Sequence, residues 1–193
     1  MRVDETITYL EMTDRSQLAT AEPPPLEVEV RRAEIPCPEF SRFFYTAIGG
    51  DWYWIDRLGW TYQQWTAFVA RPGLETWVAY VRGTPAGYFE LSGEPGGDVE
   101  IASFGLLPQF IGRGLGRYLL TVAAGRAWER NPARVWLHTC AFDHPRALAN
   151  YQASGFRIVK KETRPKDIPD ETPGPWPGAR RATTGPRCGG NVH

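Results

Sequence analysis

The sequence predicts a single α+β (mixed α/β) domain, in which helices flank one central, twisted, mostly antiparallel sheet. Three observations support this class. Segments with strand patterns outnumber those with helical patterns. Their order is two strands, two helices, three strands, then helix, strand, helix and strand, with no internal repeat. A length of 193 residues also suits one ordinary domain with a sizeable core.

The first expected elements are two short strands separated by an extended spacer. Ile7–Met12 has the composition of a strand, and Pro23–Pro25 cannot lie inside a helix. Leu26–Arg32 alternates apolar with charged residues, which predicts a strand with one buried face.

Two helical segments are expected next. Pro38–Ile48 carries aromatic residues at helical spacing, and Gly49-Gly50 ends it. A second helical run is predicted from Asp51 to Val69, with an interruption near Gly59 and with Thr61 as the cap of its second half.

Three strands then follow in succession. Glu75–Arg82 and Gly87–Leu91 are apolar segments joined by Gly83–Ala86, which indicates a hairpin. Val99–Leu107 is apolar, rich in β-branched and aromatic residues and without helical period, so it predicts a mostly buried strand. Pro108 ends it by removing a hydrogen-bond donor.

The last expected elements alternate between helix and strand. A helix starts at Leu115, and Arg134–Cys140 forms the next strand. Pro145–Ala153 is predicted to be a helix capped by Asp143, and Phe156–Glu162 is the final strand.

The expected domain covers residues 1–162. From Thr163 to His193 the chain is rich in proline and glycine with scattered charge, which predicts a mostly disordered tail without a core of its own.

Composition argues against several classes of function. Lys+Arg and Asp+Glu both number 22, so no basic excess points to nucleic acid. No apolar run is long enough for a signal peptide or a membrane span. The cysteines Cys37, Cys140 and Cys188 are odd in number and unpatterned, which predicts free thiols in a reducing, cytoplasmic compartment and no metal site. Cys140 is accordingly expected to be a buried thiol and not a nucleophile.

A glycine-rich segment lies between the strand that ends near Leu107 and the helix that starts at Leu115. Gly112, Gly114 and Gly116 let the backbone approach a ligand closely, and the unpaired N–H groups of a helix N-terminus attract anions. This pattern predicts a phosphate site, with a simple tight turn as the alternative. It lacks the third glycine of the dinucleotide fingerprint and the Gly-Lys-Ser/Thr of a Walker loop.

Two motifs resemble the GNAT superfamily of acyl-CoA-dependent N-acyltransferases. The first is Q-x-x-G-x-G, which begins at Gln109, and the second is DHPRALANYQASGF, Asp143 to Phe156. The resemblance covers roughly Leu74 to Glu162. One departure is His144, which stands where the family often has asparagine.

The resemblance implies a sheet that splays after the strand Val99–Leu107, with the pantetheine arm of acetyl-CoA lying along the gap. The implied cofactor-binding residues are Gly105, Leu106, Leu107, Gln109, Gly112, Arg113, Gly114, Leu115, Gly116 and Arg117. The positive charges of Arg113 and Arg117 suit phosphate binding, although arginines are also common on solvated surfaces.

Two catalytic residues are expected. A lysine-like amine is neutral only about once in 2,500 molecules at pH 7, so its acetylation needs a base. Glu100 is the candidate, with Glu90 or a water molecule as alternatives, and a glutamate that merely faces water is the competing interpretation. Tyr151 matches the family's general acid, although its spacing also suits a core aromatic residue.

The aromatic segment 50–60 is where the family covers its acceptor. Trp52, Trp54 and Trp60 with Asp51 and Asp56 are candidates for a cage around a cationic substrate, and packing under two helices is the alternative. The aromatic lining suggests a small-molecule acceptor, and the resemblance implies direct transfer of an acetyl group to its amine in a ternary complex. A protein lysine or N-terminal acetyltransferase and a non-catalytic CoA-binding regulatory module remain alternatives, and a homodimer stays open.

Overall fold

The computed structural model describes residues 1–93 and 97–179. Seven strands form one sheet in the order β2-β3-β4-β5-β6-β1-β7, and the pairs are antiparallel except β5 with β6. This confirms the predicted fold class. The strands are β1 (Arg2–Met12), β2 (Val28–Ala33), β3 (Leu74–Val81), β4 (Thr84–Ser92), β5 (Val99–Leu106), β6 (Val135–Cys140) and β7 (Arg157–Asp167).

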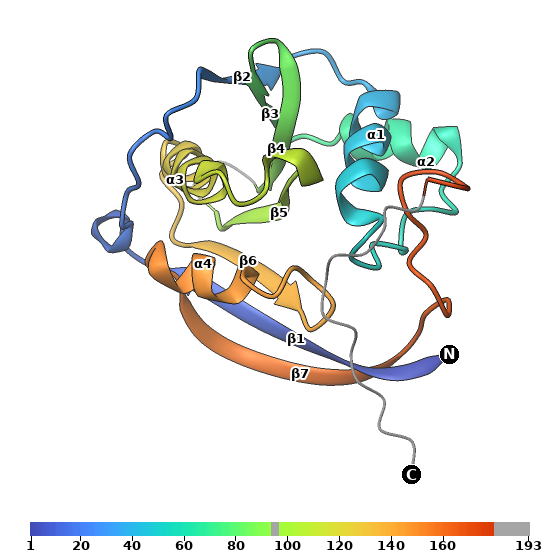
Figure 1. The fold of residues 1–193 in the computed structure, drawn as a ribbon. Coiled ribbons are helices and arrows are strands. Elements are labelled where there is room, and N and C mark those ends of the chain that lie inside the picture. Colours follow the sequence, from blue (N-terminus) through green and yellow to red (C-terminus); the bar gives the residue numbers. More distant parts are fainter. Residues whose placement is uncertain (94–96, 180–193) are drawn as a thin grey trace.

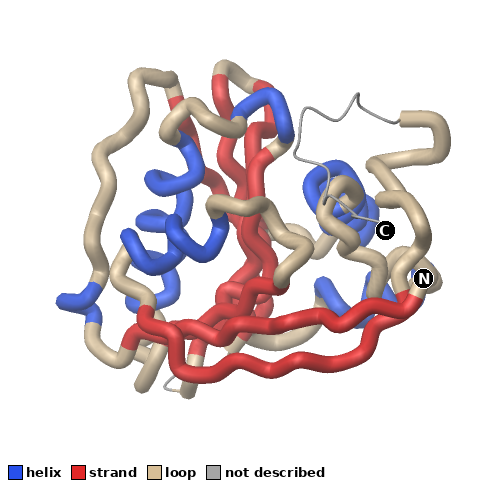
Figure 2. Tube along the Cα trace, turned by 60° about the horizontal axis from the view of Figure 1, so that its bottom comes forward, coloured by secondary structure: helices blue, strands red, loops and turns tan. Residues whose placement is uncertain are grey.

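Four α-helices lie on the two faces of this sheet, with α3 and α4 on one side and α1 and α2 on the other (Figures 1 and 2). They are α1 (Pro38–Gly49), α2 (Tyr62–Val69), α3 (Leu115–Trp128) and α4 (Ala147–Ala153), with single-turn helices η1 (Arg15–Gln17) and η2 (Pro108–Phe110). In the described residues, no helix has both the length and the apolar character needed to cross a membrane.

Each face of the sheet carries its own core. On the α3 side, Leu119 and Leu137 belong to one buried cluster. On the α1 side, the Phe44 ring stacks on Tyr88 with 4.9 Å between centroids. Each large apolar side chain removed from water contributes about 1.5–3 kcal/mol, so these two clusters hold α3, α4 and α1 on the sheet. A third cluster, which includes Tyr45 and Trp65, joins α2 to α1.

The sheet opens between its two parallel strands. Pairing of β5 with β6 is limited to Val99 with Val135 and Glu100 with Trp136, after which the strands diverge (Figure 1). The other edge of β5 stays paired with β4 as far as Leu106, apart from a bulge at Ala102. The backbone edge of β5 beyond Glu100 therefore borders an open seam, which positions the candidate site.

The predicted helical run from Asp51 to Val69 is helical only in its second half. The carbonyl of Gly49 accepts hydrogen bonds from the N–H groups of both Trp52 and Trp54, so the chain turns back directly after α1. Thr61 caps α2 as predicted, in a reciprocal capping box with Gln64. Sequence periodicity missed these turns because the aromatic side chains that stabilise them contact residues far along the chain.

The hairpin between β3 and β4 is tighter than predicted. It turns through Arg82 (φ 50°) and Gly83 (φ 79°), both in the left-handed region, as a type I′ turn requires.

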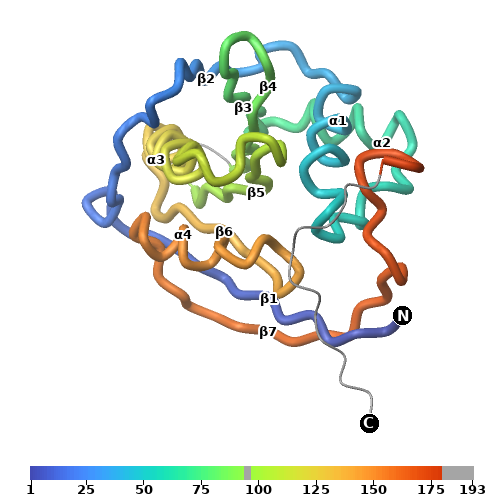
Figure 3. Tube along the Cα trace, viewed as in Figure 1, coloured from blue at the N-terminus to red at the C-terminus, as the bar shows by residue number. Residues whose placement is uncertain are grey.

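The last strand is longer than predicted. β7 continues past Glu162 to Asp167 and pairs with the start of β1 as far as Arg2 (Figure 3). Ile168 beyond it is buried. The boundary expected at residue 162 therefore falls inside β7, because an edge strand tolerates charges and a proline such as Pro165, which otherwise resemble a tail. Residues 180–193 of the predicted tail lie outside the described part.

Candidate active site

A cavity of about 910 Å³ follows the open seam between β5 and β6. Its wall includes the glycine loop at Gly112–Gly116, Tyr151 of α4, Glu100 of β5 and the aromatic segment that ends at Trp60. Residues that are widely separated in the sequence thus share one space.

The glycine loop leads into α3 with its backbone exposed. Gly112 (φ 82°) and Gly114 (φ 80°) adopt the left-handed conformation that favours glycine. Gly114 is the N-cap of α3, makes no side-chain capping bond, and is followed by no acidic residue in the first turn. The N–H groups and the positive dipole end of α3 therefore remain available to an anion at the cavity wall.

The ten residues expected to bind cofactor occupy different positions relative to this wall. Those that line the cavity are Gly105, Leu106, Gly112, Gly114, Gly116 and Arg117. Leu107 and Leu115 are buried in the α1-side core, and the N–H of Leu107 donates to Ala86 on β4. The exposed Gln109 and Arg113 are not part of the cavity wall.

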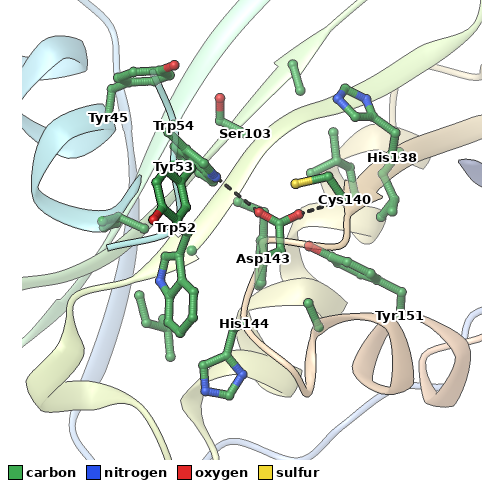
Figure 4. A pocket seen from close by; sticks show the side chains of 18 of the residues that line it. Tyr45, Trp52, Tyr53, Trp54, Ser103, His138, Cys140, Asp143, His144 and Tyr151 are labelled. Carbon is green, nitrogen blue, oxygen red and sulfur yellow. Dashed lines mark hydrogen bonds between the residues drawn. The ribbon is translucent and has the colours of Figure 1, made fainter. Parts of the chain in front are cut away.

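Tyr151 lies beside the seam with its side chain 8% exposed. Its hydroxyl points into the cavity toward Asp143 (Figure 4), and no described protein group hydrogen-bonds to it. Burial raises the pKa of this phenol well above its usual value near 10, and the nearby Asp143 and Cys140 act in the same direction. The phenol of Tyr151 is therefore protonated at physiological pH.

Asp143 has a different role from the helix cap that the sequence suggested. Its carboxylate accepts hydrogen bonds from the hydroxyl of Thr139 at 2.7 Å, the N–H of Cys140 at 2.9 Å and Nε1 of Trp54 at 3.2 Å (Figure 4). α4 instead begins after Arg146, which provides no side-chain cap. Asp143 thus connects the β6–α4 turn to the aromatic segment across the cavity, a contact over 89 residues that no local pattern reveals.

Cys140 lines the same cavity, but its thiol is not activated. Burial, together with the charge of Asp143, raises its pKa to about 12. The thiol is thus protonated at physiological pH, which argues against an acyl-cysteine intermediate.

Glu100 is the last residue of β5 to pair with β6 before the seam opens. Its side chain is 23% exposed and lines the cavity, and its Oε1 lies 3.4 Å from Nδ1 of His138. His138 of β6 is therefore a neighbour of the candidate base.

Glu90 is fully buried and absent from the cavity wall. Its carboxylate accepts hydrogen bonds from the hydroxyls of Ser41 (2.7 Å) and Ser103 (2.8 Å), and from Nη1 of Arg57 (3.4 Å). A carboxylate so enclosed cannot reach the proton of an acceptor, so Glu100 is the better candidate for the base and Glu90 is an anchor for Arg57.

We expect Glu90→Gln to lower the free energy of unfolding by about 3 kcal/mol, because it leaves the half-buried Arg57 without its counter-ion. Denaturant titration measures this change. The matched control is Glu129→Gln, which removes an exposed partner of Arg126 and should change stability by less than about 0.5 kcal/mol. Equal effects of the two variants would show that the Glu90 contacts add no stability.

The predicted tryptophan cage is not assembled around one point. Trp52 and Trp54 line the cavity, but Trp52 packs on His144 (centroids 5.1 Å apart) and Trp54 on Tyr45 (5.5 Å). Trp60 also lines the cavity, although it packs in a separate cluster under α2. Asp51 is absent from the wall.

The protein's own Arg57 contacts one ring of the expected cage, that of Trp60. The guanidinium carbon of Arg57 lies 4.1 Å from the centroid of Phe68, 5.3 Å from that of Trp60 and 5.4 Å from that of Tyr45. These ring faces are therefore already in contact with a cation.

The site therefore consists of an opening in the sheet, the exposed N-terminus of α3 and Tyr151 at the edge of the seam. The model of the acetyltransferase (GNAT) family matches residues 33–156, so the chain belongs to this family.

Solved structures share the fold. A GCN5-related N-acetyltransferase from Sphaerobacter thermophilus aligns with a TM-score of 0.63 and 18% identity, over 84% of this chain and 51% of that one. A GCN5-related N-acetyltransferase from Kribbella flavida aligns with a TM-score of 0.58 and 19% identity, over 81% of this chain and 55% of that one. The GNAT family protein SP0256 from Streptococcus pneumoniae aligns with a TM-score of 0.51 and 22% identity, over 67% of this chain and 87% of that one.

This chain thus spans only about half the length of the Sphaerobacter and Kribbella proteins. A comparison with curated proteins finds no match.

Proposed function

We propose that this enzyme transfers an acetyl group from acetyl-CoA to the amine of a small molecule, directly and within a ternary complex. The observation that carries the proposal is the single cavity whose wall includes the glycine loop, Tyr151 and Glu100. A donor bound at the loop and an acceptor bound near Glu100 would meet where the sheet opens.

The residues present suit acetyl-CoA as the donor. The N-terminus of α3 with Gly112 and Gly114 would hold the pyrophosphate, and the guanidinium of Arg117 would add positive charge. The edge of β5 at Gly105 and Leu106 would pair with the pantetheine arm. When bound, this thioester supplies an activated acetyl group.

Glu100 and Tyr151 divide the proton transfers. Glu100 would take the proton of the acceptor ammonium, which otherwise costs roughly 4–5 kcal/mol to remove at pH 7. Tyr151, which stays neutral because burial raises its pKa, would donate a proton to the departing sulfur. Direct transfer is favoured because the protonated Cys140 thiol is not a nucleophile.

A small acceptor fits better than an extended protein chain. The segment 51–61 covers the part of the cavity where the acceptor would bind. The residues after β7 extend to the start of this segment, and there the N–H of Gly174 donates to the carbonyl of Gly50 at 3.0 Å. A protein lysine or N-terminal substrate would need an open groove there. The reducing, cytoplasmic location expected from the cysteines, and a monomer or homodimer, stay predictions.

The proposal is tested by thiol release from acetyl-CoA with amino acids, polyamines, aminoglycosides, arylamines and short peptides. Acetyl-CoA binding is measured by thermal shift on the same preparation. We expect turnover with one class of small amine. Turnover with peptides alone would favour the protein acetyltransferase, and binding without any turnover would favour a regulatory module.

The base is tested by Glu100→Gln. We expect kcat/KM at pH 7 to fall about 100-fold, because the amide cannot accept the ammonium proton. The difference in kcat/KM between the variant and the wild type should shrink as the pH rises toward and above 10, where the free amine becomes the main form in solution. The dissociation constant of acetyl-CoA should not change. Equal rates of variant and wild type at pH 7 would exclude Glu100 as the base.

A further inference from the structure

Two arginines contact the same aromatic ring at the acceptor end of the cavity. The guanidinium carbons of Arg57 and Arg71 lie 4.1 and 4.5 Å from the centroid of Phe68, and both side chains line the cavity. The two cations cannot be farther apart than the sum of these distances, so their charges repel each other.

Among the residues that the structure describes, a carboxylate balances the charge of Arg57 but not that of Arg71. Arg57 pairs with the fully buried Glu90 and is itself 20% exposed. Arg71 pairs with no carboxylate among the described residues, and its Nε donates only to the backbone carbonyl of Phe68 at 3.3 Å. Its guanidinium therefore keeps donors that a ligand can use.

Arg71 and the candidate base line the same cavity, and strand pairing relates the segments that carry them. Glu100 of β5 lies opposite Ser92 of β4, and Ser92 lies opposite Leu74 of β3. Leu74 and Glu100 are thus two strand spacings, or roughly 10 Å, apart along the sheet. Arg71 lies three residues before Leu74, and its carbonyl accepts a hydrogen bond from the N–H of Leu74 at 3.2 Å. One ligand in the cavity can therefore contact both side chains.

From this arrangement we propose that the acceptor is an amine that also carries a carboxylate, as an amino acid does. Its ammonium meets Glu100, and its carboxylate binds the guanidinium of Arg71, with Arg57 as a second cation behind it. The inference rests on the proposed function, because Glu100 marks the amine end. A guanidinium matches a carboxylate through two parallel hydrogen bonds.

The same charges select against other acceptors. A polyamine would bring a second cation toward Arg71 and Arg57. Of the other carboxylates in the wall, Asp56 pairs with Lys166, and Asp143 accepts hydrogen bonds from Trp54, Thr139 and Cys140. Charge repulsion would therefore disfavour acceptors without an anionic group.

The test compares serine, methionine and phenylalanine with the amide of each, and with spermidine, in the thiol-release assay. We expect kcat/KM to be about 100-fold higher for each acid than for its amide, because a charged hydrogen-bonded pair is lost in the amide. The amides have the less basic amine, so such a preference cannot come from easier deprotonation. Equal or better turnover of amides or spermidine would overturn the proposal.

Variants then assign the preference to Arg71. Arg71→Gln should reduce the acid-to-amide ratio to about 1, and Arg71→Lys should restore part of it. The matched control is Arg42→Gln on the exposed face of α1, which should keep the wild-type ratio. An unchanged ratio in Arg71→Gln would remove Arg71 from substrate recognition.

Calorimetry separates this inference from the proposed function. Each acid and its amide are titrated into the full-length protein in the presence of CoA. Binding of acids that Arg71→Gln abolishes would support the inference even if no amine were acetylated, a result that would refute only the proposed function. Equal binding of acids and amides would refute the inference, whatever the turnover.

Discussion

Tyr151→Phe is expected to lower kcat about 10²–10⁴-fold, which is what a positioned general acid contributes. Acetyl-CoA affinity should persist, because the phenyl ring keeps its place on α4 against Phe104 and Phe156. Stability should also persist, since the lost hydroxyl has no hydrogen bond to any described protein group. Single-turnover kinetics measures the rate, a titration with acetyl-CoA measures the affinity, and thermal unfolding measures the stability.

The control for this variant is Tyr62→Phe, at an exposed tyrosine of α2 that does not line the cavity. It should behave as wild type. Because burial raises the pKa of Tyr151, its acid form persists as the pH rises. Wild-type kcat should therefore show no alkaline loss from this group below about pH 10. A Tyr151→Phe rate equal to wild type would remove the residue from the mechanism and leave it a core aromatic.

Gly116→Leu is expected to weaken acetyl-CoA binding at least 100-fold. Gly116 lies in the first turn of α3, lines the cavity and has no left-handed φ, so a leucine is compatible with the backbone there. A Cβ would meet Cδ1 of Leu106 at 3.6 Å, an ordinary contact, and the remaining side chain would occupy the space where the phosphates are expected. Gly114 would be a poorer choice, because its φ of 80° strains any other residue.

The matched control is Gly125→Leu in the same helix. A Cβ at Gly125 meets no atom within 4 Å, and the residue does not line the cavity. Both variants should gain about 0.5–1 kcal/mol of helix stability, which thermal unfolding measures. Calorimetric titration with acetyl-CoA should show weaker binding for Gly116→Leu and wild-type binding for Gly125→Leu. Equal affinity of the two variants would refute the phosphate-site assignment at α3.

Much of the fold follows from local sequence patterns. Alternation and apolar runs predicted all seven strands of the sheet, because a side-chain period of two and burial on one or both faces leave a trace in short segments. The helix starts at Leu115 and near Pro38 were also predictable from glycine and proline positions. The glycine loop could be predicted from the order of its elements alone, a strand followed by closely spaced glycines and then a helix.

Local patterns failed where distant residues decide the conformation. The segment 51–61 has enough aromatic residues to suggest a helix, but its turns depend on contacts such as Trp54 with Asp143. The end of β7 has the composition of a tail, and it is a strand because the start of β1 pairs with it.

For the candidate site, the sequence by itself determined the candidates for the chemistry: the glycine loop follows from the order of strand, glycines and helix, and Glu100 and Tyr151 follow from the resemblance to the family. Only the tertiary structure decided which of them share a space, because the seam between β5 and β6 exists only in the assembled sheet. It also decided that Glu90 serves Arg57 and that Arg71 remains without a carboxylate partner among the described residues. Charge pairing depends on distance in space, and a linear sequence does not contain that distance.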